Sequence, residues 1–277
     1  SQPATTARLV YASATGSGSD APASGRPGFD QIAQGYSGLM SVTGTDESGP
    51  TRVGVAIGDQ AAGMWAAMGV LAALLQRQAT GRGQRVETSL LSSLVGLLSV
   101  QGQRYLSLGE VPGLAGNTHP VISPYGVFNT QDGPLNIAPA TGDMWSRLCR
   151  VLGLPGLLDD ARFADNARRV EHRHELKELL ESRLTQHDRA HWTALLMEAG
   201  IPVGPINDMA DVFADAQVQH SRLVQQIEHP ALGPLKLVGS PIAMDSLAGR
   251  GIRRAPPELG EHTHELLAEL GWGEGAI

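Results

Sequence analysis

The chain has 277 residues, of which 42% are hydrophobic, and its formal net charge at pH 7 is −7. This length can bury a substantial core. The basic residues are scattered, which excludes an extended nucleic-acid surface. A single cysteine excludes a disulfide framework and a cysteine-rich zinc site within one chain, and we expect no metal. The apolar stretches are too short or too rich in Gly and Ala to predict a membrane span.

The first part of the chain predicts an α/β layer. A buried strand is predicted at 9–13 and another at 52–57. The stretch 61–78 predicts a helix, because its large apolar residues recur every three or four positions. Ala fills much of the remainder, so we expect this helix to be buried on most sides. A strand at 85–88 and a helix at 89–108 follow, and this alternation is typical of parallel strands.

The pattern changes after Gly109 to that of an α+β region. A loop at 113–120 is followed by strands at 125–130 and 135–138, and Asp132-Gly133 between them indicates a hairpin. Three helices are then predicted, from Thr141 or Asp143 to Gly153, over 172–184 and over 188–199. A short helix from Asn207 or Asp208 to Phe213, a strand at 235–238 and a closing helix at 261–270 are predicted after them. Cys149 lies in the first of these helices, and we expect a buried, inert thiol.

Asp59 is the strongest candidate for chemistry. It lies between a predicted buried strand and the start of a buried helix, where ligands of α/β sheets bind. The helix N-terminus favours an ionised carboxylate, and such a carboxylate can attack an acyl carbon. Gly58 before it and the small residues after it leave room for a substrate. The simplest alternative is that Asp59 only caps the helix.

Two loops carry weaker signals. The segment Ala14-Thr15-Gly16-Ser17 follows the first strand and could present backbone N–H groups to a phosphate or an amide, or it could be a plain surface loop. It lacks the pattern of a phosphate-binding P-loop. His119 lies in a loop of Gly, Asn and Pro residues, where polar side chains often bind ligands, although an ordinary loop histidine is the simpler interpretation. The histidines at 172, 174, 187 and 191 indicate solvated helix faces.

Several phrases together resemble the family III CoA-transferases, a group that also contains acyl-CoA racemases. They occur in the order of that family and cover nearly the whole chain. The phrases are Leu9–Ser13, Arg26–Asp30, Gly38–Ser41, Gly54–Asp59, Thr80–Gln84, Gly116–Pro120, Gly200–Pro205 and Pro256–Thr263.

The resemblance implies a Rossmann-like large domain, a smaller α+β domain and an interlocked homodimer. On this basis we expect a large domain at 1–112, a small domain at 113–206, and a segment at 207–277 that returns to pack on the large domain. A cytoplasmic enzyme is expected that acts on an acyl-CoA and a small carboxylic acid.

The resemblance also implies roles for site residues. Asp59 matches the family's nucleophile, which forms a mixed anhydride with the acyl group and then a thioester with CoA. Ala14, Thr15, Gly16 and Ser17 match the loop that contacts coenzyme A. Gly116, Asn117 and His119 are expected at the acyl group, with His119 able to bind an acceptor carboxylate.

Three departures from the family pattern shape these expectations. The racemases carry a histidine where Phe29 stands, and Phe can be neither the acid nor the base of a racemisation, so transfer is favoured. The formyl-CoA branch carries a run of glycines near Gly116–Pro120 that is absent here, which favours a short dicarboxylate over formate or oxalate. A sizeable family segment precedes the strand at Leu9, and we expect it to be missing here. A racemase and a catalytically silent dimer partner remain the alternatives.

Overall fold

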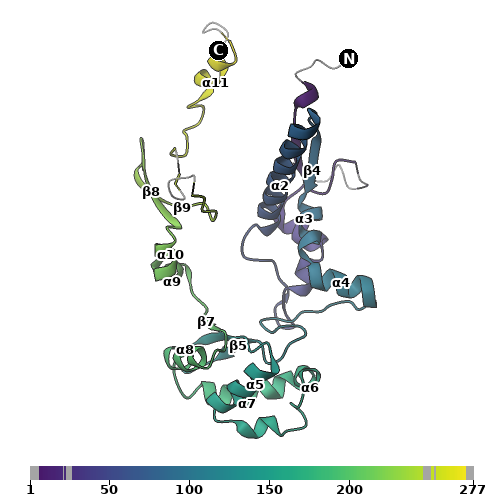
Figure 1. Ribbon diagram of the computed structural model, residues 1–277, viewed down its shortest axis with the longest axis vertical. Coiled ribbons are helices and arrows are strands. Elements are labelled where there is room, and N and C mark those ends of the chain that lie inside the picture. The colour runs from purple at the N-terminus through teal and green to yellow at the C-terminus, as the bar shows by residue number, and fades with distance from the viewer. Residues whose placement is uncertain (1–5, 21, 23–26, 246–250, 253, 273–277) are drawn as a thin grey trace. The chain divides into compact units, whose positions relative to one another are not determined.

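The computed structural model describes residues 6–20, 22, 27–245, 251–252 and 254–272. The chain forms two compact units, Ser1–Gly204 and Pro205–Ile277 (Figure 1). The first unit begins with β1 (Tyr11–Thr15), α1 (Asp30–Tyr36), β2 (Gly44–Thr45), β3 (Gly49–Pro50), α2 (Ile57–Thr80), β4 (Arg85–Ser89), α3 (Leu90–Leu97) and α4 (Ser99–Leu108). It continues with β5 (Gly126–Asn129), β6 (Pro134–Ile137), α5 (Gly142–Val151), α6 (Asn166–Glu171), α7 (Arg173–Leu184), α8 (Arg189–Glu198) and β7 (Val203–Pro205).

The predicted α/β layer is confirmed in its parallel strand pair. β1 and β4 run parallel, with Tyr11 opposite Arg85, and α2 packs against both strands (Figure 1). Gly69 of α2 leaves no room for a side chain, because a Cβ there would lie 2.5 Å from Cγ1 of Val86. The small residues of α2 therefore allow it to approach β4 closely, and Gly81 ends the helix in the left-handed region at φ 71°.

Two predicted elements are wrong in this layer. Residues 52–57 form no strand, because the N–H of Val53 donates to the side chain of Gln34 instead of a neighbouring strand. The single helix predicted at 89–108 is two helices, α3 and α4, and the break coincides with the positive φ of 28° at Ser99.

Within the described residues, α2 is less buried than predicted. Trp65 is 45% exposed and Leu71 is 62% exposed, and Tyr11 on the predicted buried strand β1 is 58% exposed. By length and composition alone α2 could cross a membrane, although it packs against β1, β4, α1 and α3. The expectation of no membrane contact therefore stays a prediction.

The main core of the first unit lies among β5, β6 and the helices α5, α7 and α8. The predicted hairpin is confirmed, with Gly126 opposite Ile137. The buried residues of this core are Phe128, Leu135, Ile137, Trp145, Leu148, Cys149, Leu152, Leu157, Phe163, Leu176, Leu180, Leu184, Trp192, Leu196 and Ile201. Burial raises the pKa of the Cys149 thiol to about 12, so it stays protonated at neutral pH, in agreement with the predicted inert thiol.

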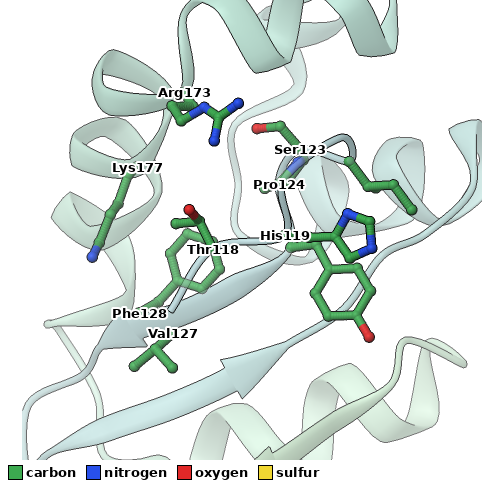
Figure 2. Close-up of a pocket in the computed structure, with 10 residues that line it drawn as sticks. Thr118, His119, Ser123, Pro124, Val127, Phe128, Arg173 and Lys177 are labelled. Carbon is green, nitrogen blue, oxygen red and sulfur yellow. The ribbon is translucent and has the colours of Figure 1, made fainter. Parts of the chain in front are cut away.

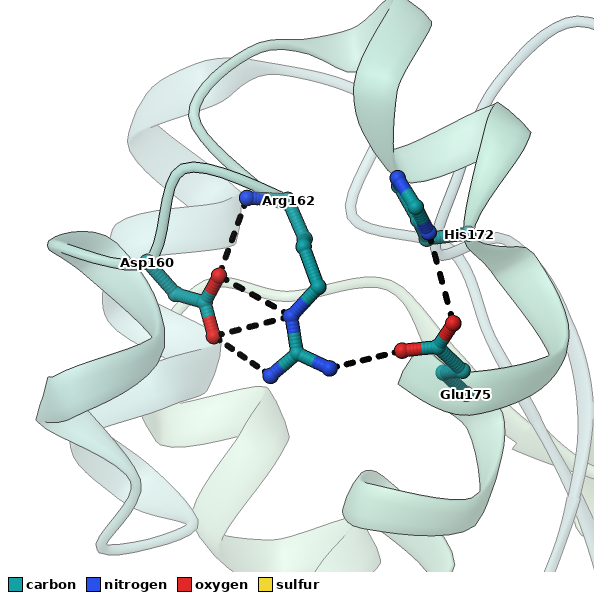
Figure 3. A network of polar contacts seen from close by, with 4 residues as sticks. All are labelled: Asp160, Arg162, His172 and Glu175. Carbon is teal, nitrogen blue, oxygen red and sulfur yellow. Dashed lines mark hydrogen bonds and ion pairs between the residues drawn. The ribbon is translucent and has the colours of Figure 1, made fainter.

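A polar network joins α7 to the loop that follows the short helical turn at 155–158 (Figure 3). Arg162 pairs with Asp160 at 2.7 Å and with Glu175 of α7 at 2.7 Å, and Glu175 also lies 3.4 Å from Nδ1 of His172. The hydrogen bonds from Arg162 lower the pKa of Asp160. The network holds the outer face of α7, while Leu176 and Leu180 anchor its inner face.

The second unit contains α9 (Met209–Ala214), α10 (Ala216–His220), β8 (Val224–His229), β9 (Gly233–Val238) and α11 (Thr263–Glu269). Asp208 caps α9 and accepts from the N–H of Asp211, as predicted. β8 pairs antiparallel with β9 and was not predicted, because Gln and Glu interrupt its apolar pattern. The domain boundary expected near residue 112 and the return of 207–277 to the large domain stay predictions.

Candidate functional site

Asp59 is the third residue of α2. The helix begins at Ile57 with Ala56 as its N-cap, and no side chain caps it. The alternative that Asp59 only caps the helix is therefore wrong. Its carboxylate is exposed and makes no hydrogen bond or ion pair with any residue that the structure describes. The carboxylate thus stands in the first turn of α2, the end of the helix that carries partial positive charge.

The first turn of α2 is held by α1. Oδ1 of Asp30 accepts from the backbone N–H of Gly58 at 2.7 Å, and its Oδ2 accepts from Nε2 of Gln34 at 2.6 Å. Oε1 of Gln34, which is fully buried, accepts from the N–H of Val53 at 2.8 Å. These three bonds fix both ends of the segment that leads to Asp59.

Gly58 is the position next to Asp59 where space is most restricted. A Cβ at Gly58 would lie 3.0 Å from Oδ1 of Asp30 and 3.1 Å from Cδ1 of Leu94. The backbone at the start of α2 therefore packs directly against α1 and α3. This close packing sets the position of the neighbouring carboxylate and leaves its outer side open.

The loop Ala14–Ser17 begins within β1 and leads away from its carboxyl end. Oγ1 of Thr15 accepts from the N–H of Gly18 at 2.9 Å, which closes a turn. The carbonyl of Gly16 accepts from the N–H of Leu91 at 3.1 Å, at the start of α3. The loop thus lies at the edge where both parallel strands end, which is the edge that binds ligands in such sheets.

This loop meets the segment that supports Asp59. A Cβ at Gly28 would lie 2.3 Å from Cα of Gly16, so the two backbones touch. Beside this contact is a hollow of about 150 Å³, lined by Gly16, Ser17, Pro27, Gly28, Phe29, Ile32, Ala33 and Tyr36. The structure therefore brings Gly16 and Ser17 next to α1, whose Asp30 bonds to Gly58. Asp59 itself does not line this hollow.

An ion pair on β4 holds the far side of the loop. Oε1 of Glu87 accepts from the N–H of Ser19 at 3.0 Å, and Arg85 pairs with Glu87 at 2.7 Å while donating to Oγ of Ser19. The hydrogen bonding of Ser19 lowers the pKa of Glu87 below its ordinary value of 4.5. A carboxylate with a lowered pKa stabilises the fold above its ordinary pKa, and this contribution is lost as the pH falls through the lowered value.

Replacing Glu87 with glutamine is expected to loosen the loop, since one charge-assisted bond is lost. The urea midpoints of the wild type and E87Q should differ at pH 6 and converge as the pH falls below 4.5. Glu110→Gln removes an exposed ion pair with Arg104 elsewhere and serves as the matched control. A difference that is constant down to about pH 3 would contradict this role.

His119 lies in a second hollow (Figure 2). Its backbone N–H donates to the carbonyl of Tyr125 at 2.8 Å, and its ring stacks on that of Tyr125 at 4.9 Å between centroids. Nδ1 accepts from the N–H of Val121 at 3.2 Å. The residues that line the hollow are Thr118, His119, Ile122, Ser123, Pro124, Tyr125, Val127, Phe128, Arg173 and Lys177. Neither Asp59 nor the loop 14–17 is among them.

Gly116 and Asn117 act through their backbone in the described contacts. The N–H of Gly116 donates to the carbonyl of Gly44 at 2.8 Å, which joins this loop to β2. The carbonyl of Asn117 accepts from Val127 at 3.1 Å and excludes any side chain at Gly126, where a Cβ would lie 2.3 Å from it. The contact with the carbonyl of Asn117 explains why glycine stands at position 126.

The sequence interpretation assigned no role to Asp30 or Gln34, or to Arg173 and Lys177. Asp30 stands in the phrase Arg26–Asp30 that carried the resemblance, which is a signal that could have found it. Arg173 and Lys177 lie on a helix face that charge pattern alone assigns to solvent. Within the described residues, no group of three His, Cys, Asp or Glu side chains could hold a metal ion.

The chain matches the family model described as CoA-transferase family III over residues 3–263. It is 40% identical over 270 residues to the succinyl-CoA:glutarate CoA-transferase of Mus musculus, an alignment that covers 97% of this chain and 62% of that one. It is 36% identical to the succinate–glutarate CoA-transferase of Agrobacterium fabrum, with 95% of this chain and 66% of the relative covered. The chain thus spans about three fifths of the length of the mouse relative.

The fold agrees with solved structures. A CaiB/BaiF family protein from Brucella suis matches with a TM-score of 0.80 and 35% identity over 95% of this chain and 68% of that one. A protein from Mycobacterium tuberculosis matches with a TM-score of 0.81 and 26% identity over 94% and 68% of the two chains. The predicted α/β fold is confirmed by these matches, and the chain belongs to CoA-transferase family III.

Proposed function

We propose that this protein is a CoA-transferase that moves CoA from an acyl-CoA to a carboxylic acid through a covalent intermediate on Asp59. The observation that carries the proposal is the exposed Asp59 carboxylate, which has no partner among the described residues at the N-terminus of α2. A carboxylate held by a hydrogen bond or an ion pair would be a weaker nucleophile. The named relatives that transfer CoA support the same activity.

The proposed reaction begins when a carboxylate oxygen of Asp59 attacks the thioester carbonyl carbon. The C–S bond breaks, a mixed anhydride forms, and the CoA thiolate leaves with the electron pair. The thiolate then attacks the Asp59 carbonyl carbon of the anhydride, which releases the donor acid and leaves an aspartyl-CoA thioester. No net proton transfer is needed.

The second half of the proposed reaction repeats these steps in reverse with a new acid. The acceptor carboxylate attacks the aspartyl thioester and expels CoA thiolate, and an anhydride joins Asp59 to the acceptor. The thiolate attacks the acceptor carbonyl carbon, and the Asp59 carboxylate is restored. The backbone N–H of Asp59 makes no hydrogen bond to a described residue, so it can donate to a developing oxyanion.

The loop Ala14–Ser17 is proposed to contact the CoA portion of the substrate. Close approach of Gly16 and Gly28 leaves backbone rather than side chains at the edge of the hollow beside α1, which suits a long, narrow ligand. Oγ1 of Thr15 closes a turn by accepting from the N–H of Gly18. We therefore propose contacts from backbone groups and not from a cation in this loop.

A dicarboxylic acid is the proposed acceptor class. The mouse and Agrobacterium relatives are named for succinate and glutarate, while a relative from Acetobacter aceti at 32% identity is named for acetyl-CoA and oxalate. A cytoplasmic, interlocked homodimer is the form in which we propose that the enzyme acts. A racemase would need an acid or a base where Phe29 stands, so the site supports it less.

The proposal is tested by mixing the protein with succinyl-CoA, adding hydroxylamine and mapping the modified peptide by mass spectrometry. We expect a hydroxamate on Asp59, because hydroxylamine traps acyl carbons of anhydrides and thioesters. Binding of CoA without modification of any carboxylate, together with exchange of the α-proton into deuterated water, would instead support a racemase. Absence of both CoA binding and modification would indicate a catalytically silent chain.

A further inference from the structure

The hollow beside His119 is lined by two cationic side chains that the proposed reaction does not use. Arg173 and Lys177 stand one helical turn apart on α7 and therefore share a face. Both are half-buried and line the hollow, and they extend from one side of it while His119 lies on the other (Figure 2). No acidic side chain lines this hollow within the part of the chain that the structure describes.

Arg173 has no carboxylate partner among the described residues. Its Nε donates to the carbonyl of Val170 at 3.0 Å, and its Nη2 lies 3.4 Å from the carbonyl of Pro120. Backbone carbonyls orient the guanidinium but do not neutralise it. The remaining N–H groups of Arg173 are therefore available to an anion.

Lys177 is only loosely paired. Its Nζ lies 3.7 Å from Oε1 of Glu181, and the same oxygen already accepts from the N–H of Asn129 at 2.7 Å. Glu181 is thus divided between Lys177 and a backbone N–H, and Arg173 has no carboxylate partner among the described residues, so the hollow keeps a net positive charge. Nδ1 of His119 is used as an acceptor, so in the neutral ring Nε2 carries the proton and is a further donor.

The hollow is small and partly apolar. Its free volume of about 20 Å³ takes a water molecule or the end of one polar group, and not a whole substrate. Val127 and Phe128 line it together with the cations. A carboxylate at the end of a short apolar chain has the charge, the planar shape and the size that such a hollow recognises.

We propose that Arg173 and Lys177 bind the second carboxylate of a dicarboxylic substrate, and that this hollow selects dicarboxylic over monocarboxylic acids. The proposal rests on the proposed CoA-transferase function and deepens it. The carboxylate can come from the acceptor acid or from the acyl group of the donor, and the two sources are separated by varying each substrate in turn.

The test measures transfer by Arg173→Gln and Lys177→Gln with matched acids. Glutarate and pentanoate have the same chain length and differ by one carboxylate. Each variant is expected to raise the KM for glutarate about tenfold and to leave that for pentanoate unchanged. If the donor is the source, the KM for succinyl-CoA rises while that for butyryl-CoA does not.

Arg183→Gln is the matched control, because Arg183 lies on the same helix, is exposed and does not line the hollow. Lys177→Gln keeps the test decisive if Arg173→Gln fails to fold. Equal effects on dicarboxylic and monocarboxylic substrates would overturn the proposal and point to the phosphates of CoA. Unchanged KM values for all substrates would overturn it as well.

A binding measurement separates this proposal from the proposed function. Titration calorimetry with glutarate needs no turnover, and we expect binding to weaken about tenfold in Arg173→Gln and to stay unchanged in Arg183→Gln. If the wild type transfers no CoA but shows this binding pattern, only the proposed function fails. If it transfers CoA but Arg173→Gln and Lys177→Gln both bind glutarate like the wild type, only the subsite fails.

Discussion

Asp59→Asn is expected to lower the rate of CoA transfer by at least about 10³-fold, because an amide cannot form the covalent intermediate. The loss should fall on kcat, since the side chain lines neither hollow. Hydroxylamine should no longer modify the peptide that contains residue 59. Steady-state kinetics with succinyl-CoA and glutarate, followed by peptide mapping, measure both effects.

The fold of this variant should be nearly unchanged. The side chain of Asp59 is exposed and makes no hydrogen bond to a described residue, so only its interaction with the N-terminus of α2 is lost. That interaction contributes about 0.3–1 kcal/mol to the free energy of unfolding at exposed sites. A variant that melts close to the wild type and still transfers CoA within tenfold of its rate would show that the nucleophile is elsewhere.

The predictions that succeeded depend on short-range pattern. The apolar spacing of α2 and the hairpin around Gly133 are local signals, and each corresponds to an element of the structure. The prediction of a strand at 52–57 was wrong although the apolar residues of this segment follow the local pattern of a strand. A long-range bond from Val53 to Gln34 decided the backbone there, and no local pattern reports it.

The burial of α2 was overestimated for a different reason. Periodicity identifies apolar faces but not what covers them, and Met64, Trp65 and Leu71 remain exposed in this chain. For the same reason the candidate site was predicted only in part. Gly16, Ser17 and Asp59 were proposed one by one, whereas the contact of Gly16 with Gly28 that brings the two segments together depends on the fold.

Asp30→Ala is expected to lower kcat/KM about 10- to 100-fold, although Asp30 lies outside the proposed chemistry. The substitution leaves the N–H of Gly58 without its acceptor, and a buried donor without a partner costs about 1–3 kcal/mol. Since Gly58 precedes Asp59, the cost should appear as a displaced nucleophile and slower hydroxamate formation. Asp46→Ala, in the exposed turn between β2 and β3, is the matched control.

Asp30 and Gln34 also permit a test by exchange. Asp30→Asn alone cannot satisfy both neighbours. If its side-chain oxygen accepts from the N–H of Gly58, its NH2 group faces the NH2 group of Gln34, and two donors then meet without an acceptor. In the double variant D30N/Q34E, the amide introduced at position 30 can donate to the carboxylate introduced at position 34. That carboxylate can still accept from the N–H of Val53. We therefore expect D30N to be impaired and the double variant to recover part of the rate, with full recovery opposed by the burial of a charge at position 34. A double variant slower than D30N would show that the Asp30 charge itself, and not the chain of hydrogen bonds, controls the position of Asp59.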